Sequence, residues 1–208
     1  MSKKEQERYD ELYKLEGYFG SEASPGLKRT NQLINLVGGK IKTILDVGCG
    51  SGHSVREFLK KGYGCKGVET SEYLIKNQLR DLVKKGLVKK NSADNLEFED
   101  KSFDITFCTD VMEHIPINEI PRAIKEMSRV SRRYLFFTIE YGPSDFKEGG
   151  KDLHVTQRNR RWWIKTIERF GEVKLIKPSS LWNYVITLKT LRFKFIKKQD
   201  YFLFEKIK

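Results

Sequence analysis

The sequence predicts an α/β protein with a largely parallel, doubly wound sheet. Three observations predict it. Short apolar runs such as Ile41–Val47 and Phe103–Cys108 indicate buried strands, segments with helical spacing separate them, and no internal repeat or long linker interrupts the alternation. Strands that are joined by helices need crossover connections, which place neighbouring strands in parallel. One domain over residues 1–208 follows, with residues 1–38 as an N-terminal helical lid or cap segment.

Each element is predicted from its own spacing and from the residues that end it. Gly38 and Gly39 end one helix and Gly86 ends another, because glycine favours the position after a helix. The predicted helices span residues 3–16, 27–37, 54–61, 72–85, 118–131 and 159–170. The predicted strands span residues 41–47, 65–69, 87–90, 103–108, 134–139, 172–177 and 201–206. Residues 17–26 and the polar segment after residue 139 are predicted to be loops.

The composition argues against membrane and secreted proteins. No run approaches the ~20 apolar residues that a membrane-spanning helix needs. The charged residues 1–8 do not form a secretory signal. The sequence has three cysteines, an odd number, and none of them forms a C-x-x-C pair. We therefore expect Cys49, Cys65 and Cys108 to pack as small buried hydrophobic residues in a protein of a reducing compartment. These features predict a cytoplasmic protein.

The net charge of +12 points toward anionic partners. A basic surface favours nucleic acid, anionic membranes or phosphorylated substrates. The lysines are scattered along the chain and do not form an arginine-rich arm, so a solvated surface is the simpler interpretation and a nucleic-acid partner is not favoured.

The first strand runs into a glycine-rich turn, Asp46-Val-Gly48-Cys-Gly50-Ser-Gly52, and a helix follows at once. Such a turn lets a ligand approach the backbone closely. A dinucleotide fingerprint, G-x-G-x-x-G, would require glycine at position 53, which is His53. The spacing G-x-G-x-G therefore disfavours a dinucleotide.

This turn resembles motif I of the class I S-adenosylmethionine (SAM)-dependent methyltransferases. Three further segments resemble the family's motifs, in its order and at its separations: Gly67-Val-Glu-Thr-Ser71, Ser92-Ala-Asp-Asn95, and the segment from Phe103 to Pro116 with its Glu-His pair. The chain is similar to type 11/12-like members of the small-molecule or glycan-modifying branch. The resemblance covers residues 41–139. It implies a Rossmann-like, mostly parallel sheet of seven strands with an antiparallel C-terminal strand.

The resemblance also implies a cofactor, SAM, and its product S-adenosylhomocysteine. Glu69 would bind the ribose hydroxyls, since a carboxylate accepts hydrogen bonds from both, and Asp94 would lie near the adenine amino group. Asp46 either holds the glycine turn through backbone amides or contacts the ligand. We expect no metal ion. The cofactor-binding residues implied are Asp46, Gly48, Cys49, Gly50, Gly52, His53, Glu69, Thr70, Ala93, Asp94, Asn95, Thr109 and Asp110.

The acceptor site is less well specified, because methyl transfer depends largely on positioning and a base is needed only for acceptors of high pKa. His114, after the fourth strand, and His154, in a loop that faces the acceptor in related enzymes, are the candidate catalytic residues. Arg158 and Arg161 are candidates to bind an anionic substrate. Tyr18 is a further substrate-binding candidate, in a lid over the cofactor.

We therefore expect a methyltransferase that acts on a small-molecule or sugar-like acceptor, at oxygen. One alternative is methylation of RNA or protein, which the basic charge favours, although the D/N-P-P-Y signature is absent after Cys108. The other is a non-catalytic SAM-fold binding module, because no base is unmistakable.

Overall fold

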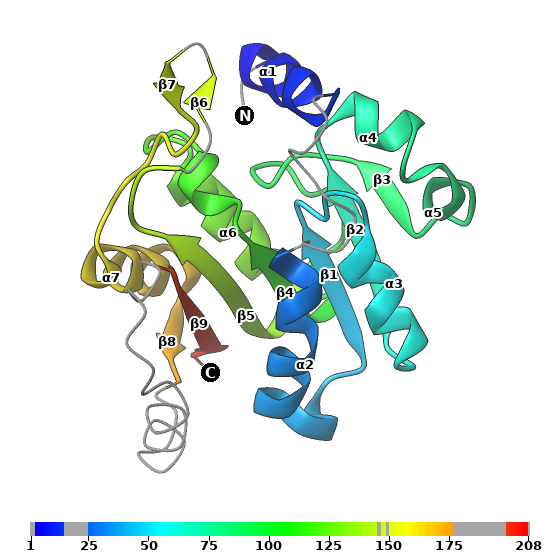
Figure 1. The fold of residues 1–208 in the computed structure, drawn as a ribbon. Coiled ribbons are helices and arrows are strands. Elements are labelled where there is room, and N and C mark those ends of the chain that lie inside the picture. Colours follow the sequence, from blue (N-terminus) through cyan, green and yellow to red (C-terminus); the bar gives the residue numbers. More distant parts are fainter. Residues whose placement is uncertain (1–2, 15–24, 145–146, 149, 177–198, 208) are drawn as a thin grey trace, which may run out of the picture.

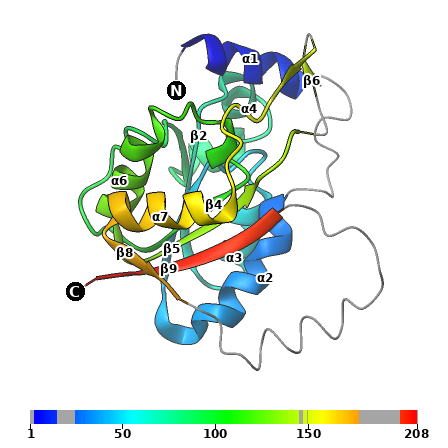
Figure 2. The ribbon, with the colours of Figure 1, turned by 90° about the vertical axis from the view of Figure 1, so that its left-hand side faces the viewer.

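The computed structural model describes residues 3–14, 25–144, 147–148, 150–176 and 199–207. A seven-stranded sheet with the order β3-β2-β1-β4-β5-β9-β8 forms its centre, and helices cover both faces (Figures 1 and 2). The sheet strands are β1 (Thr43–Val47), β2 (Gly64–Glu69), β3 (Val88–Lys90), β4 (Phe103–Thr109), β5 (Ser131–Glu140), β8 (Val173–Leu175) and β9 (Gln199–Lys206). The α-helices are α1 (Lys3–Lys14), α2 (Pro25–Val37), α3 (His53–Lys60), α4 (Glu72–Lys76), α5 (Arg80–Lys84), α6 (Ile120–Val130) and α7 (Arg160–Gly171). The short 3-10 helices are η1 (Gly38–Lys40) and η2 (Met112–His114).

The directions of the strands confirm the predicted sheet. β1 pairs in parallel with β2 and β4, β2 pairs in parallel with β3, and β4 pairs in parallel with β5. β9 is antiparallel to both β5 and β8. The reversal of strand order at β1 sends the connections to opposite faces of the sheet, and parallel order brings the carboxyl ends of β1, β2, β4 and β5 to one edge.

Two hydrophobic cores lie on the two faces of the sheet. Along β5, Leu135 and Phe137 join α6 and α7 in one core, whereas Tyr134 and Phe136 join α2, α3, α4 and α5 in the other. This follows from the period of two in a strand, because successive side chains point to opposite faces. The three cysteines are buried in these cores with free thiols, as predicted.

Asp104 has a structural role at the start of β4. Its Oδ2 accepts the backbone N–H groups of Lys42 (2.7 Å) and Thr43 (3.0 Å), and its Oδ1 pairs with Arg132 at 2.6 Å. Three segments are thereby held in register at the edge of the sheet opposite the carboxyl ends.

Three predicted elements differ from the structure. The helix predicted over residues 72–85 is broken into α4 and α5, because Asn77 donates its side-chain amide to the carbonyl of Tyr73 and the chain turns there. Pro25 and Gly26, predicted to be in a loop, form the first turn of α2, where the fixed φ of proline suits a helix. The polar loop after β5 contains a hairpin of β6 (Lys147–Glu148) and β7 (Lys151–Asp152).

In the part of the chain that the structure describes, no helix combines the length and apolar character needed to cross a membrane. α1 lies beside α4 at the carboxyl edge of the sheet (Figures 1 and 2). Asp10 holds it there by accepting hydrogen bonds from the Ser71 hydroxyl and from the backbone N–H of Tyr73.

Candidate active site

A pocket opens at the carboxyl ends of the strands, between the turn after β1, the end of β2, the loop after β3, the segment after β4, and α1. It contains about 1010 Å³ of empty space, part of which is open to solvent. Parallel α/β sheets bind ligands at this edge. The glycine turn and His114 both line the pocket.

The glycine turn can form only with residues that tolerate left-handed backbone. Gly48 has φ +74° and Gly50 has φ +54°. A Cβ on Gly48 would lie 2.5 Å from Cγ2 of Val111, so the turn packs against the segment after β4. A Cβ on Gly50 would meet no atom within 4 Å, so this part of the turn faces open space. The turn therefore presents bare backbone to a ligand.

Glu69 joins the glycine turn to the end of β2. Its Oε2 accepts the backbone N–H of Gly50 at 2.9 Å, and its Oε1 accepts those of Thr70 and Ser71 at 2.8 and 3.0 Å. Burial raises the pKa of this carboxyl, although the three amides oppose the shift. Glu69 thus anchors the backbone of the pocket and also lines it.

Asp46 is buried beneath the turn and does not line the pocket. It accepts a hydrogen bond from the Ser54 hydroxyl in the first turn of α3. Burial raises its pKa to about 7, and the charge of Glu69 adds to the effect. Of the two roles predicted for Asp46, the structure favours support of the turn, through a side-chain hydroxyl rather than backbone amides.

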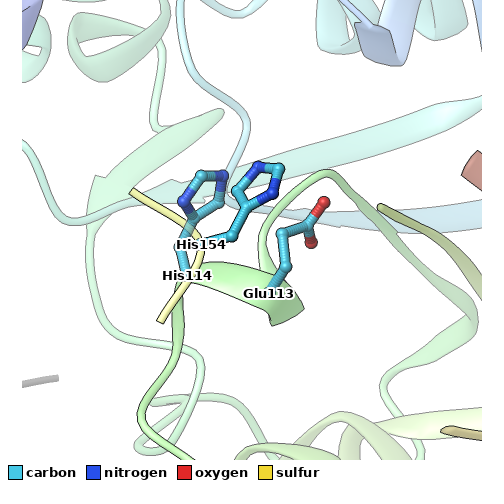
Figure 3. Close-up of side chains that lie close together, drawn as sticks. All are labelled: Glu113, His114 and His154. Carbon is cyan, nitrogen blue, oxygen red and sulfur yellow. The ribbon is translucent and has the colours of Figure 1, made fainter. Parts of the chain in front are cut away.

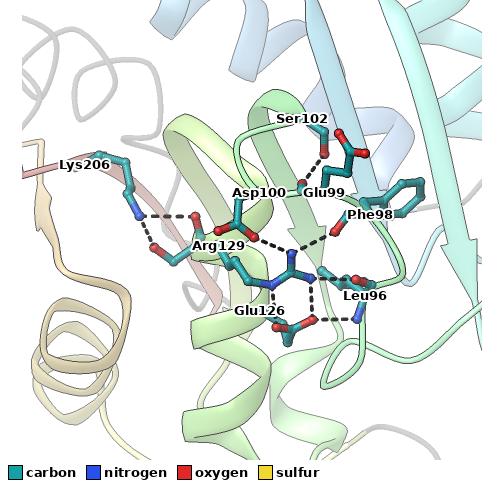
Figure 4. A network of polar contacts seen from close by, with 9 residues as sticks. Leu96, Phe98, Glu99, Asp100, Ser102, Glu126, Arg129 and Lys206 are labelled. Carbon is teal, nitrogen blue, oxygen red and sulfur yellow. Dashed lines mark hydrogen bonds and ion pairs between the residues drawn. The ribbon is translucent and has the colours of Figure 1, made fainter.

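The loop after β3 forms the wall that carries Ala93 and Asp94. Arg129 of α6 holds this loop by donating hydrogen bonds to the carbonyls of Leu96 (2.7 Å) and Phe98 (2.8 Å), as Figure 4 shows. The same guanidinium pairs with Glu126 and Asp100, each at 2.8 Å. The hydrogen bonds that Arg129 donates to both carboxylates raise the pKa of its guanidinium. The wall is therefore fixed from outside the pocket by a permanently charged group.

The opposite end of the pocket is formed by side chains from distant segments. His114 lines it, and the ring of His154 lies next to that of His114, with ring centroids 4.8 Å apart (Figure 3). The loop of His154 is bound to η2, since the N–H of Thr156 donates to the carbonyl of Glu113 at 3.0 Å. Burial and the neighbouring His154 lower the pKa of His114 to about 4, so His114 is neutral at physiological pH.

The structure brings together most of the predicted cofactor residues and separates the others. Those that line the pocket are Gly48, Cys49, Gly50, Glu69, Thr70, Ala93, Asp94, Thr109 and Asp110. Those that lie outside its lining are Asp46, Gly52, His53 and Asn95. Gly52 caps α3, and His53 begins that helix with its Nδ1 2.5 Å from the Ser51 hydroxyl.

The predicted substrate residues are not gathered at the pocket. Arg158 and Arg161 are exposed at the start of α7 and do not line it. Arg158 lies instead over the ring of Trp162, at 5.9 Å from the centroid. Tyr18 lies outside the described residues. Trp163 is fully buried in the core.

Tyr9 and Tyr13 of α1 line the pocket, although the sequence did not assign them to it. Tyr9 is edge-on to His114, with centroids 5.6 Å apart. The spacing of Tyr9 and Tyr13 places both on one face of a helix, but this spacing alone does not predict what that face packs against. Asn91 was also missed; it lines the pocket, and its buried Nδ2 has no hydrogen-bond partner among the described residues.

The part of the chain that forms this pocket is similar to known methyltransferases. A family model described as a methyltransferase domain matches residues 45–136, from β1 into β5. The chain is 28% identical over 108 residues to the uncharacterized methyltransferase YcgJ of Bacillus subtilis, covering 49% of this chain and 42% of that protein. It is 34% identical over 98 residues to norajmaline N-methyltransferase of Rauvolfia serpentina, covering 44% and 33%. The chain thus spans less than half the length of these curated relatives.

The fold agrees over nearly the whole chain. The crystal structure of magnesium protoporphyrin IX methyltransferase from Synechocystis PCC 6803 with bound S-adenosylhomocysteine superimposes with a TM-score of 0.69 at 11% identity, covering 98% of this chain and 100% of that chain. The chain thus shares the fold of this methyltransferase. The residues that match the methyltransferase-domain model, 45–136, include the glycine turn, Glu69, Asp94 and His114.

Proposed function

We propose that this protein binds SAM in the pocket and transfers its methyl group to a small-molecule or sugar-like acceptor, at oxygen. The observation that carries the proposal is the buried carboxylate of Glu69 beside the bare backbone of Gly50, at the edge of the sheet where the strand order reverses. When bound, SAM supplies an electrophilic methyl group on a sulfonium.

The residues of the pocket suit that cofactor. Gly50 leaves room for a ligand beside the turn, and Glu69 offers oxygens suited to a ribose diol. The unpartnered Nδ2 of Asn91 gives a ligand atom a buried donor, which matters because an unsatisfied buried donor costs about 1–3 kcal/mol. The adenine side of the cofactor would lie along the wall of Ala93 and Asp94.

His114 and His154 would form the acceptor end. His114 is neutral and lines the pocket, so it would contact the acceptor, and His154 would position it. Oxygen as the acceptor atom is favoured by this pair, because a neutral imidazole accepts a hydrogen bond from a hydroxyl. α1 would act as a cap, since Tyr9 and Tyr13 cover the opening beside His114.

The basic charge keeps an RNA or protein acceptor as a second candidate. The two arginines predicted to bind an anion, Arg158 before α7 and Arg161 in its first turn, are exposed and do not line the pocket, which favours a small acceptor that enters the pocket without them. A cytoplasmic location remains a prediction from the sequence.

Calorimetry with SAM, S-adenosylhomocysteine and NAD tests the cofactor proposal. We expect the first two to bind and NAD not to bind. Release of S-adenosylhomocysteine with a panel of hydroxylated, amino and RNA acceptors then tests the acceptor. Turnover only with amines or RNA would overturn the oxygen proposal, and SAM binding without any turnover would favour a binding module.

A matched pair of glycine variants separates the pocket from general backbone strain. Gly50 and Gly86 both have left-handed φ, +54° and +66°, and at both a Cβ would meet no atom within 4 Å. Gly86 lies between α5 and β3, away from the pocket. We expect Gly50→Arg to weaken SAM binding at least ~100-fold, about 2.7 kcal/mol, and Gly86→Arg to leave it unchanged. Equal effects of the two substitutions would contradict the proposal.

A further inference from the structure

Glu113, His114 and His154 bring three metal-ligating groups together at the acceptor end of the pocket. Their ligand atoms all lie within 4.8 Å of one another (Figure 3). Two of the residues come from η2 and the third from the loop after β7, so the fold assembles the group across 40 residues of sequence. Glu113 is fully buried and His154 is only 7% exposed.

The hydrogen bonds of both histidines leave the same ring nitrogen available. Nδ1 of His114 lies 3.1 Å from the carbonyl of Leu153, and Nδ1 of His154 lies 2.7 Å from the carbonyl of Gly142. A carbonyl only accepts hydrogen bonds, so each Nδ1 donates to its carbonyl and Nε2 is the nitrogen left to bind an ion. Metal-binding histidines use this arrangement, in which the second nitrogen is fixed by an outer partner.

The carboxyl of Glu113 lacks a partner on one side. Its Oε1 accepts the backbone N–H of Glu140 at 2.9 Å, whereas Oε2 is buried and has no hydrogen-bond partner among the described residues. A cation beside Oε2 would satisfy this oxygen and offset the cost of burying its charge.

We propose that Glu113, His114 and His154 bind a divalent transition-metal ion through one carboxylate oxygen and two Nε2 atoms. Two imidazoles and a carboxylate favour zinc, manganese, iron or cobalt over magnesium, which prefers oxygen ligands. Ligands of a tetrahedral zinc ion lie about 3.3 Å apart, since each is 2.0–2.1 Å from the metal. The ligand atoms, which lie within 4.8 Å of one another, would have to move closer together to bind one ion.

The position of the site gives the ion a role in the proposed reaction, and this role rests on the proposed function. His114 also lines the pocket, so an ion held by it lies at the acceptor end, with coordination positions left for an acceptor oxygen. A metal there would bind a hydroxyl or carboxylate of the acceptor and orient it, and it would lower the pKa of a bound hydroxyl. This proposal revises the expectation from the sequence that the protein uses no metal.

Metal binding is tested directly on the full chain, without any acceptor. The protein is dialysed against a chelator, incubated with Zn²⁺ or Mg²⁺, dialysed again, and its metal content is measured by mass spectrometry. A Co²⁺ titration followed by its visible absorption reports the coordination. We expect one equivalent of Zn²⁺ to be retained, no Mg²⁺, and a saturable Co²⁺ spectrum. Failure of the folded wild-type protein to retain Zn²⁺ would overturn the proposal.

Two pairs of variants identify the ligands. Glu113→Gln keeps the shape of the side chain, and His154→Asn can keep a donor near the Nδ1 position while it removes Nε2. Each substitution is expected to weaken Co²⁺ binding at least tenfold. The controls are Glu99→Gln, an exposed carboxylate, and His53→Asn, the remaining histidine, which should both retain the ion. Circular dichroism verifies that each variant is folded. If wild type, Glu113→Gln and His154→Asn bind Co²⁺ equally, the assigned ligands are wrong.

SAM binding by the chelator-treated protein keeps this proposal separate from the proposed function. The glycine turn and Glu69 lie apart from the three ligands, so we expect SAM to bind without the metal. SAM binding without zinc retention would overturn only the metal site. Zinc retention without SAM binding would overturn only the proposed function.

Discussion

The two ends of the pocket are built in different ways. The cofactor end is mostly backbone: a glycine turn, the amides at the end of β2, and the carboxylate of Glu69 that binds them. The acceptor end is mostly side chains, from η2, α1 and the loop after β7. The backbone geometry of the cofactor end depends on a few neighbouring residues. The side-chain arrangement of the acceptor end depends on packing between segments that are distant in sequence. The cofactor end can therefore stay the same while the acceptor end changes.

His114→Asn provides the largest test of this separation. His114 lines the pocket from η2, and no hydrogen bond among the described residues joins its side chain to the glycine turn or Glu69. We expect kcat for methyl transfer to fall at least ~100-fold, about 2.7 kcal/mol in activation free energy. The Kd for SAM should change less than about threefold. A parallel loss of SAM affinity, measured by calorimetry, would show that the two ends are not independent.

Gly48→Ala tests the point where the two ends touch. The new Cβ would lie 2.5 Å from Val111 Cγ2, and the φ of +74° disfavours a side chain. We expect the free energy of unfolding to fall by about 2 kcal/mol. In the double variant with Val111→Ala about half of this loss should return, because the contact is removed but the backbone strain stays. If the losses of unfolding free energy caused by Gly48→Ala and Val111→Ala simply add in the double variant, as measured by urea unfolding, the clash with Val111 is not the cause.

The cofactor end was largely predictable from the sequence because its determinants are local. The glycine turn and Glu69 occupy strand ends that the apolar runs already predict, and their place in the pocket follows from parallel order. The acceptor end was not predictable in the same way. His154 lies beside His114 only because the loop after β7 binds η2, and Tyr9 covers the site because Asp10 holds α1 against α4. The spacing of these residues in the sequence does not predict those contacts.

Asp46→Asn tests the buried support beneath the glycine turn. The pKa of Asp46 is raised to about 7 in the folded protein, above its unfolded value, so its contribution to stability is present at low pH and is lost as pH rises toward 7. Asparagine stays neutral and can still accept the Ser54 hydroxyl. We expect similar stability of the two proteins at pH 4 and a gain for Asp46→Asn on the order of 1–2 kcal/mol at pH 8.

Urea unfolding of the protein without cofactor at the two pH values measures this difference. Glu99→Gln, which removes an exposed carboxylate, should show no such pH dependence. If Asp46→Asn raises the free energy of unfolding equally at both pH values, burial of the Asp46 charge is not the cause of the gain.

Arg132→Ala should have the smallest effect. It removes the 2.6 Å ion pair with Asp104, but Arg132 is half exposed, and Asp104 keeps its two backbone hydrogen bonds. We expect a loss of about 0.5 kcal/mol in unfolding free energy. The affinity for SAM should not change, because this pair lies at the edge of the sheet opposite the pocket. A loss above about 2 kcal/mol would show that the register of β1 and β4 depends on this pair.

The position of β9 between β5 and β8 has a consequence for synthesis of the protein. β5 pairs with β9 along seven residues, from Tyr134 with Glu205 to Glu140 with Gln199, yet α7 and β8 are synthesised before β9. While the ribosome makes these segments, β5 keeps an open edge of unpaired amides and carbonyls, which invites pairing with other chains. The half of the sheet under the acceptor end is thus completed late, and a nascent chain that ends before Gln199 should depend on chaperones.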